Sequence, residues 1–330
     1  MKVSELGEFG LIDLLATIAP QGGPEHRMLV GIGDDAAAWR GDDSTVLATT
    51  DAMVEGVHFA TGTPWWELGW KALAVNLSDI AAMGGIPEHA LVNLSLPGAT
   101  EVEDVTRLYR GMAELADRHQ VAIVGGNITS APVVMIAVTV IGRGLKEGLL
   151  RRSAAAPSDR IAVTGYLGSA AAGLRILTGG QKVPPQAATY LKKAHLQPQP
   201  RIPEGQALVK RGVRTAIDIS DGLVADLGHV CAASKVGATL RVNTVPIHPL
   251  MKDAFGKVAL VLALSGGEDY ELLFTASERV IDEVRAAIGA DCPVTVIGDI
   301  TGGTGVVLLG EDGKPYHIDG PGWDHFQKGA

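Results

Sequence analysis

The chain has 330 residues and a formal net charge of −9, with 46% hydrophobic residues, 20% charged residues and 42 glycines. The length exceeds a typical domain of roughly 100 to 200 residues, so we expect two domains. The composition excludes a disordered or coiled-coil chain, and acidic charge with scattered basic residues argues against a nucleic-acid surface. We expect a compact α/β protein with no nucleic-acid partner.

The two cysteines and the N-terminus bear on cellular location. Cys231 and Cys292 are isolated thiols without CxxC spacing, which favours a reducing compartment and no disulfide or zinc role. The N-terminal stretch MKVSELGEFGLIDLL mixes acidic with apolar residues, which is typical of an amphipathic helix rather than a signal peptide. No apolar run approaches the roughly 20 residues that span a bilayer. We therefore predict a cytoplasmic protein without a membrane partner.

The first half of the chain alternates β-branched runs with helical stretches. The pattern predicts a strand at 44–51, a helix at 64–85, a strand at 89–97, a helix at 102–119, and strands at 120–126 and 133–142. This order predicts an α/β or α+β sheet with helices on one face. The pattern lapses near 142–160, so we place the domain boundary there and expect domains at 1–145 and 146–330.

The segment AIVGGNITS, residues 122–130, ends its apolar run on Gly125 and Gly126. A glycine pair after a strand predicts a tight turn, because glycine alone adopts positive φ freely. The alternative is that the bare backbone and the Asn127 amide oxygen meet a phosphate or a metal. The residues alone leave both interpretations open.

The second half begins again with a strand. We predict a strand at 160–168, a helix at 169–177, a rigid proline-rich connector at 196–205, a strand, turn and helix at 216–234, and a glycine-led turn and strand at 265–276. No repeat of 20 to 50 residues is visible.

Acidic residues gather in turns beside glycines. The groups are Asp34 and Asp35, Asp51, Asp79, Asp218 and Asp221, and Glu268 and Asp269. Each alone is typical of a cap or turn. Together, carboxylates and hydroxyls presented by turns are the oxygen ligands that Mg²⁺ prefers, completed by water and phosphate oxygens. The pattern favours a site in which several Mg²⁺ ions hold a polyphosphate against an acidic protein.

Other nucleotide-binding scaffolds fit poorly. The sequence GIGDDA matches G-x-G-x-x-A, and Asp51 lies at about the distance of a ribose-binding acid. However, the next residues predict a strand instead of a helix, and two aspartates would repel a pyrophosphate. The P-loop and protein-kinase motifs are also absent from the sequence. A phosphoryl-transfer enzyme would therefore need another scaffold.

An ordered series of motifs resembles the thiamine-monophosphate kinase family over nearly the whole chain. The series is GIGDDAA, TTDAMVEGVHF, KALAVNLSDIAAMGG, VGGNIT, RRSAAAPSD, VTGYLGSAAAGL, AIDISDGL, SGGEDYELLFT and GWDHF. VEGVHF and GWDHF separate this kinase from relatives such as aminoimidazole ribonucleotide synthase. The reactive N-terminal cysteine of selenophosphate synthetase and the C-terminal cysteine of the hydrogenase maturation factor HypE are both missing.

The resemblance implies a two-domain PurM-like fold. A ferredoxin-like N-terminal α/β domain would pair with its copy in a homodimer, and a C-terminal α/β domain would close over the nucleotide. It implies that ATP phosphorylates thiamine monophosphate to thiamine diphosphate and ADP, the final step of thiamine diphosphate biosynthesis. Mg²⁺ would be required, with K⁺ as an accessory ion. We expect direct in-line transfer, because no covalent nucleophile or general base stands out.

The resemblance also implies roles for single residues. The metal ligands would be Asp35, Thr49, Thr50, Asp51, Asp79, Asn127, Asp218 and Asp221. ATP would contact Tyr109, Gly126, Asn127, Arg152 and Ser220. Thiamine monophosphate would contact His58, Glu268 and Trp323. Two alternatives stay open: another ATP-dependent enzyme of this superfamily, of the aminoimidazole ribonucleotide synthase kind, and a non-catalytic nucleotide or metal sensor.

Overall fold

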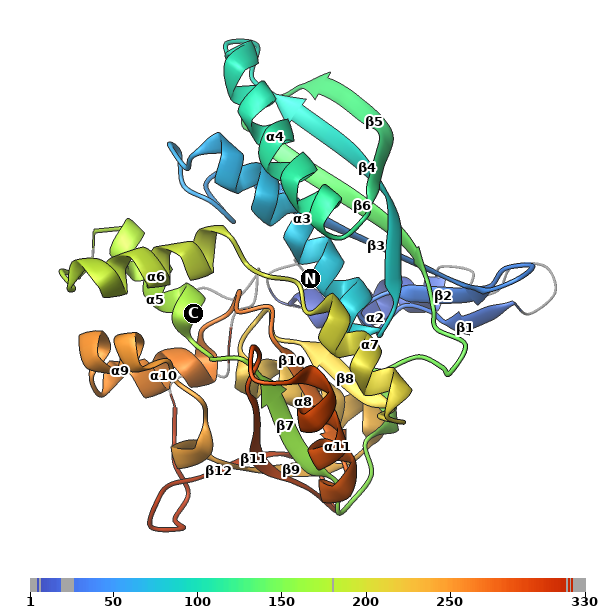
Figure 1. The fold of residues 1–330 in the computed structure, drawn as a ribbon, viewed down its shortest axis with the longest axis vertical. Helices are drawn as coiled ribbons and strands as arrows, with labels where there is room; N and C mark the ends of the chain where they lie inside the picture. The colour runs from blue at the N-terminus through green and yellow to red at the C-terminus, as the bar shows by residue number, and fades with distance from the viewer. Residues whose placement is uncertain are drawn as a thin grey trace.

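A computed structural model describes residues 5, 7–18, 27–179, 181–318, 320 and 322 (Figure 1). It contains two six-stranded sheets, one in the upper and one in the lower part of Figure 1, with helices packed against them. The predicted mixed α/β architecture is thereby confirmed. The boundary expected at residue 145 falls between the last strand of the first sheet and the first strand of the second, and its position stays a prediction.

The first sheet has the strand order β1-β2-β3-β6-β4-β5. Its strands are β1 (Met28–Val30), β2 (Ala37–Arg40), β3 (Thr45–Val54), β4 (Ile86–Leu96), β5 (Ala122–Ser130) and β6 (Met135–Arg143). Neighbours are antiparallel except β4 and β5, which are parallel. The helices α3 (Trp65–Ala82) and α4 (Val102–Arg118) pack together on one face of this sheet, as the sequence predicts.

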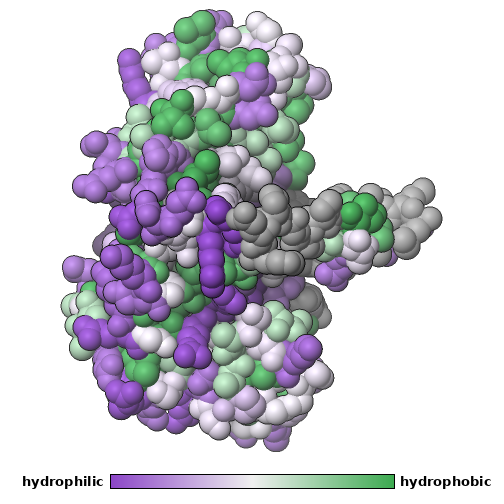
Figure 2. Space-filling view, turned by 90° about the vertical axis from the view of Figure 1, so that its right-hand side faces the viewer, coloured by the Kyte–Doolittle hydropathy of each residue, from purple (hydrophilic) through white to green (hydrophobic). Residues whose placement is uncertain are grey.

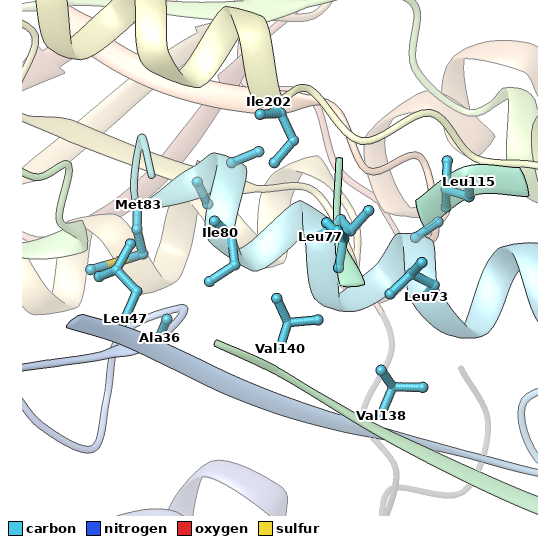
Figure 3. Close-up of a cluster of buried hydrophobic side chains, with 14 of the residues drawn as sticks. Ala36, Leu47, Leu73, Leu77, Ile80, Met83, Leu115, Val138, Val140 and Ile202 are labelled. Carbon is cyan, nitrogen blue, oxygen red and sulfur yellow. The ribbon is translucent and has the colours of Figure 1, made fainter. Parts of the chain in front are cut away.

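Helix α3 is the central element of the core. Its buried Leu73, Leu77 and Ile80 face apolar side chains of β3 and β6 (Figure 3). Burial of one such side chain contributes roughly 1.5 to 3 kcal/mol. This packing fixes α3 across the sheet and so fixes the polar residues near its C-terminal end.

The turn predicted at the glycine pair is wrong, because β5 continues through both glycines to Ser130. Gly126 has φ +153°, and a Cβ atom there would lie 1.8 Å from the Val92 carbonyl oxygen of β4. The glycine is therefore needed for close approach of two strands. Strand β5 ends the sheet, and its residues are exposed apart from the half-buried Ile123.

The second sheet has the strand order β12-β9-β11-β7-β10-β8. Its strands are β7 (Arg160–Thr164), β8 (Thr215–Asp218), β9 (Gly237–Arg241), β10 (Leu272–Ala276), β11 (Val294–Thr301) and β12 (Gly305–Leu309). The helices in this half are α5 (Ser169–Leu177), α6 (Pro185–Leu196), α7 (Ile202–Lys210), α8 (Leu223–Ser234), α9 (Pro249–Phe255), α10 (Val258–Ser265) and α11 (Glu278–Ile288), with 3₁₀ turns η1 (Arg152–Ala154) and η2 (Val242–Thr244).

Two helices test the predictions for residues 196–205 and for the N-terminal stretch. The expected connector at 196–205 is partly wrong, because α7 begins at Ile202; Pro203 is tolerated there since the first turn needs no backbone N–H donor. The predicted N-terminal helix is present as α2 (Glu8–Ile18). Across the part of the chain that the structure describes, no helix is both long and apolar enough to cross a membrane.

Candidate active site

A cavity of about 1660 Å³ lies where the two sheets and α3 meet. Most of the residues expected to bind metal, nucleotide or substrate line it: Asp35, Thr49, Thr50, Asp51, His58, Asp79, Arg152, Asp218, Ser220, Asp221 and Glu268. These residues come from segments far apart in the sequence. The fold thus gathers most of the predicted site in one place.

Three aspartates form the acidic centre of the cavity. Asp35 precedes β2, Asp79 lies on α3 and Asp218 ends β8, and one carboxylate oxygen of each lies within 4.8 Å of the others. Among the described residues, no hydrogen-bond donor reaches the buried Oδ2 atom of Asp35. Three oxygen ligands and an unpartnered buried oxygen fit a divalent cation such as Mg²⁺.

The electrostatics of this centre support that fit. Burial, followed by the nearby Asp35 charge, raises the pKa of Asp218 to about 8. Burial and the charges of Asp51 and Asp218 likewise raise the pKa of Asp79 well above its usual range. Desolvated like charges favour protonation unless a cation compensates them. The centre is therefore poorly compensated by the protein alone.

Hydroxyl groups orient two of these carboxylates. Thr49 on β3 donates a hydrogen bond to Asp79, with 2.5 Å between Oγ1 and Oδ2. Ser78 on α3 donates to Asp218, with 2.6 Å between Oγ and Oδ2. The Thr50 hydroxyl donates to the Val138 carbonyl oxygen at 3.1 Å, so this side chain is already engaged within the sheet.

Arg152 in η1 brings a positive charge to the acidic centre. Its Nη2 atom donates to Asp35 Oδ1 at 2.5 Å, and its backbone N–H donates to the Asp34 carboxylate at 3.2 Å. The buried Nε atom has no hydrogen-bond acceptor within the described chain. The guanidinium therefore keeps donors for a phosphate, which it can bind in a bidentate manner.

The turn between β8 and α8 presents Ser220 and Asp221. Asp226 holds this turn, because its Oδ2 atom accepts hydrogen bonds from the backbone N–H groups of Asp221 and Gly222, each at 3.1 Å. Asp226 and His229 also bring ligand atoms within 4.8 Å of Asp221. Asp226 was not predicted from the sequence, and His229 was assigned no role there; their spacing of three residues on α8 is the signal that could have placed them on one face.

His58 and Glu268 occupy other parts of the cavity wall. The Nδ1 atom of His58 accepts a hydrogen bond from the Val54 backbone N–H at 3.0 Å, so the neutral ring carries its proton on Nε2. The Glu268 backbone N–H donates to the Ser220 carbonyl oxygen at 2.8 Å. This bond places Glu268 next to the turn that carries Ser220.

Three predicted residues of the described chain are not among those lining the cavity, and a fourth lies outside the described residues. Asn127 is exposed on β5, where its Nδ2 atom lies 3.5 Å from Asn93 Oδ1, and Gly126 is its neighbour. Tyr109 on α4 lines a separate hollow of about 590 Å³. Trp323 lies outside the described residues. The roles expected for these residues therefore stay predictions.

Comparison with known proteins shows the class to which this protein belongs. Residues 33–144 match the AIR synthase related protein N-terminal domain, and residues 156–310 match the corresponding C-terminal domain. The chain is 40% identical over 301 residues to the thiamine-monophosphate kinase of Escherichia coli (strain K12), covering 90% of this chain and 92% of that protein. It is 35% identical over 329 residues to the thiamine-monophosphate kinase of Aquifex aeolicus (strain VF5), covering 99% and 100%.

A solved structure agrees with these sequence matches. "AaThiL complexed with AMPPCP and TMP" superposes with a TM-score of 0.86 and 34% identity, over 98% of this chain and 99% of that chain. The chain belongs to the thiamine-monophosphate kinase family, within the AIR synthase related proteins. The resemblance and the PurM-like fold expected from the sequence are confirmed.

Proposed function

We propose that this protein transfers the γ-phosphate of ATP to thiamine monophosphate, giving thiamine diphosphate and ADP. The observation that carries the proposal is the convergence of Asp35, Asp79, Asp218 and Arg152 on one cavity. At about 1660 Å³, this cavity exceeds the roughly 300 to 1,000 Å³ of a typical ligand pocket, so it has room for two ligands. A protein 34% identical to this chain was solved with AMPPCP and TMP together.

Mg²⁺ ions belong to this proposal. Asp35, Asp79 and Asp218 would hold one, and Asp51 and Asp221 extend the oxygen ligands along the cavity wall. When bound, Mg²⁺ neutralises phosphate charge and fixes the geometry of the phosphoryl group. The accessory K⁺ ion rests on the sequence resemblance alone.

The residues of the chain itself would position the two phosphates. The acceptor is an oxygen of a phosphate monoester, whose second pKa is about 6, so it is largely ionised at neutral pH and needs no strong base. The bond from this oxygen to the γ-phosphorus forms as the bond between γ-phosphorus and ADP breaks. Arg152 would donate to the transferred group, because its Nη2 atom is anchored by Asp35 and its Nε atom, 4.0 Å from Asp34 Oδ1, makes no hydrogen bond within the described chain.

A second copy of the chain would complete the site. Strand β5 is an exposed edge that carries Val124 and Ile128, which are 55% and 68% exposed, and Figure 2 shows apolar surface over the first sheet. Exposed apolar edge strands are normally covered. A homodimer formed through β5 would bury Val124 and Ile128 and would bring Asn127 and Gly126 to the partner's cavity.

Location in the cytoplasm is proposed on chemical grounds. Cys231 and Cys292 are both buried, unpaired thiols, and burial raises the pKa of each, to about 11 and about 12 respectively. Such thiols are unreactive and are typical of proteins from a reducing compartment.

The test is an assay of the purified protein with ATP, Mg²⁺ and thiamine monophosphate, in which thiamine diphosphate is quantified by chromatography. We expect its formation to match the release of ADP one for one, and to require both substrates. Binding of ATP without turnover would instead support a nucleotide sensor. ADP release only with a formylglycinamidine-type substrate would support a synthase.

A further inference from the structure

Two buried side chains converge on Glu268. The Nζ atom of Lys71, on α3, lies 2.6 Å from Glu268 Oε1. The Nδ1 atom of His195, on α6, lies 3.1 Å from Glu268 Oε2. Lys71 is 4% exposed and His195 is 5% exposed. Within the described chain, neither nitrogen has a partner that meets hydrogen-bond geometry, so their closest polar contacts are these ion-pair distances to Glu268. Each carboxylate oxygen thus faces one buried nitrogen.

The backbone around Glu268 is constrained as well. Glu268 has φ +68° and Tyr270 has φ +51°, a region that is strained for a residue other than glycine. Hydrogen bonds from their backbone N–H groups to the carbonyl oxygens of Ser220 and Ile219, at 2.8 and 2.9 Å, hold this conformation. Backbone and side chain are therefore both fixed, and such strain concentrates at functional sites.

The charges of this group are matched. Burial alone would raise the pKa of Glu268, but Lys71 and His195 lower it to about 2, so the carboxylate stays ionised. Burial and the nearby Lys71 lower the pKa of His195, so its ring is neutral at pH 7 and Nδ1 can carry the proton that faces Glu268. Lys71 therefore cancels the charge of Glu268 within the protein.

A contribution to the stability of the fold is by itself a weak reason for burying Lys71, His195 and Glu268 together. A buried ion pair is often no more stable than apolar residues of similar volume. Lys71 and Glu268 both line the cavity, whereas a pair that only supported the fold could lie anywhere in the core. An ionised carboxylate has about four lone-pair positions, and two contacts leave others for a ligand.

We propose that Lys71 and His195 are positioning residues that orient Glu268 toward the acceptor substrate. The inference rests on the proposed function and adds how that substrate is recognised. Because Lys71 already balances its charge, Glu268 acts as a directed hydrogen-bond acceptor and not as a counter-ion for a cationic ring. It therefore selects a substrate that presents an N–H group as a hydrogen-bond donor, such as the amino group of an aminopyrimidine.

A double-mutant cycle tests the proposal, with KM for thiamine monophosphate and KM for ATP measured separately. We expect Lys71→Met and Glu268→Gln each to raise KM for thiamine monophosphate by about 10-fold, the factor that corresponds to 1.4 kcal/mol, with KM for ATP unchanged. The variant carrying both changes should be no worse than Glu268→Gln alone, because Lys71 acts only through Glu268. Lys193→Met, an exposed lysine on α6, is the matched control and should leave both constants unchanged.

If Lys71→Met alone does not fold, the double variant and variants of His195 still test the proposal. The double variant leaves no unpaired buried charge. We expect His195→Phe to raise KM for thiamine monophosphate and His195→Asn, whose amide can replace Nδ1, to restore it. Effects of Lys71 and Glu268 that multiply in the double variant, or an unchanged KM in Lys71→Met and His195→Phe, would overturn the proposal. An inactive wild-type protein would instead refute the proposed function itself.

Discussion

Ser78 and Asp218 are joined by a hydrogen bond of 2.6 Å, although they lie 140 residues apart in the chain. Ser78 belongs to the helix that fills the core under the first sheet, and Asp218 ends the outer strand β8 of the second sheet. Both residues are buried. The acidic centre therefore exists only where the two halves of the chain meet, and its stability should respond to the charge on Asp218.

The metal-free protein should lose stability as pH rises from about 4 to about 8. Burial raises the pKa of Asp218 from 3.8 to about 8 in the folded protein, so in this window the folded state binds a proton that the unfolded state has released. Thermal unfolding without metal should show a falling Tm over that range. Mg²⁺ should restore more stability at pH 8 than at pH 5, because it binds the ionised carboxylates.

Asp218→Asn should flatten this pH dependence and raise the Tm of the metal-free protein at pH 8, while activity falls by at least about 100-fold, as expected for loss of the proposed metal ligand. Asp43→Asn, at an exposed position, is the control and should change neither property. A Tm profile of Asp218→Asn that matches the wild type would show that Asp218 is not buried among like charges.

Arg152→Lys should lower kcat/KM for ATP by at least about 10-fold. Lysine keeps the positive charge but cannot offer two parallel donors to a phosphate while Asp35 anchors the group. Steady-state kinetics measure the effect. Arg151→Lys is the matched control, because Arg151 does not line the cavity. Equal kinetics of Arg152→Lys and the wild type would exclude a bidentate contact with the transferred phosphate.

Ile128→Asp should convert the proposed dimer into a monomer. The side chain is 68% exposed on the edge strand β5, and burying an unpaired carboxylate in an interface is costly. Light scattering after size-exclusion chromatography gives the mass, and activity should fall together with dimerisation. Val307→Asp, on the exposed side of β12, should stay dimeric. A wild-type protein that is monomeric at micromolar concentration would contradict the proposed interface.

Asn127 tests whether β5 of a second copy reaches the cavity. Asn127→Asp adds a negative ligand and should lower the Mg²⁺ concentration that gives half-maximal activity. Asn127→Ala removes the amide oxygen and should raise it. Titration of activity with Mg²⁺ measures both. If neither change alters the requirement, Asn127 serves only the strand, where it already faces Asn93.

The local features of this site could be predicted from the sequence, whereas contacts between residues far apart in the chain could not. The DISDGL segment encodes a strand, a turn and a helix start, so the elements that carry Asp218, Ser220 and Asp221 were predicted correctly from local pattern, while the roles of these residues stay predictions. The contact of Lys71 with Glu268 depends on how α3 packs against a turn almost 200 residues later, which no local pattern encodes. A lysine inside the apolar run WKALAV was the available signal, because buried lysines need a partner.

At the glycine pair of β5, by contrast, the local sequence pattern itself gave the wrong prediction. Glycine usually marks a turn, but here the missing Cβ permits β4 to approach, so tertiary packing determined the conformation at Gly126. For the same reason, the sequence motif containing Asn127 gave no sign that this residue lies outside the chain's own cavity.

The most direct test of the proposed kinase reaction is a single-turnover experiment with ATP labelled on its γ-phosphate, Mg²⁺ and thiamine monophosphate. We predict that the label passes to the terminal phosphate of thiamine diphosphate, with no labelled protein at any time. Label trapped on the protein would contradict direct transfer, and label released only as inorganic phosphate, without thiamine diphosphate, would contradict the kinase function.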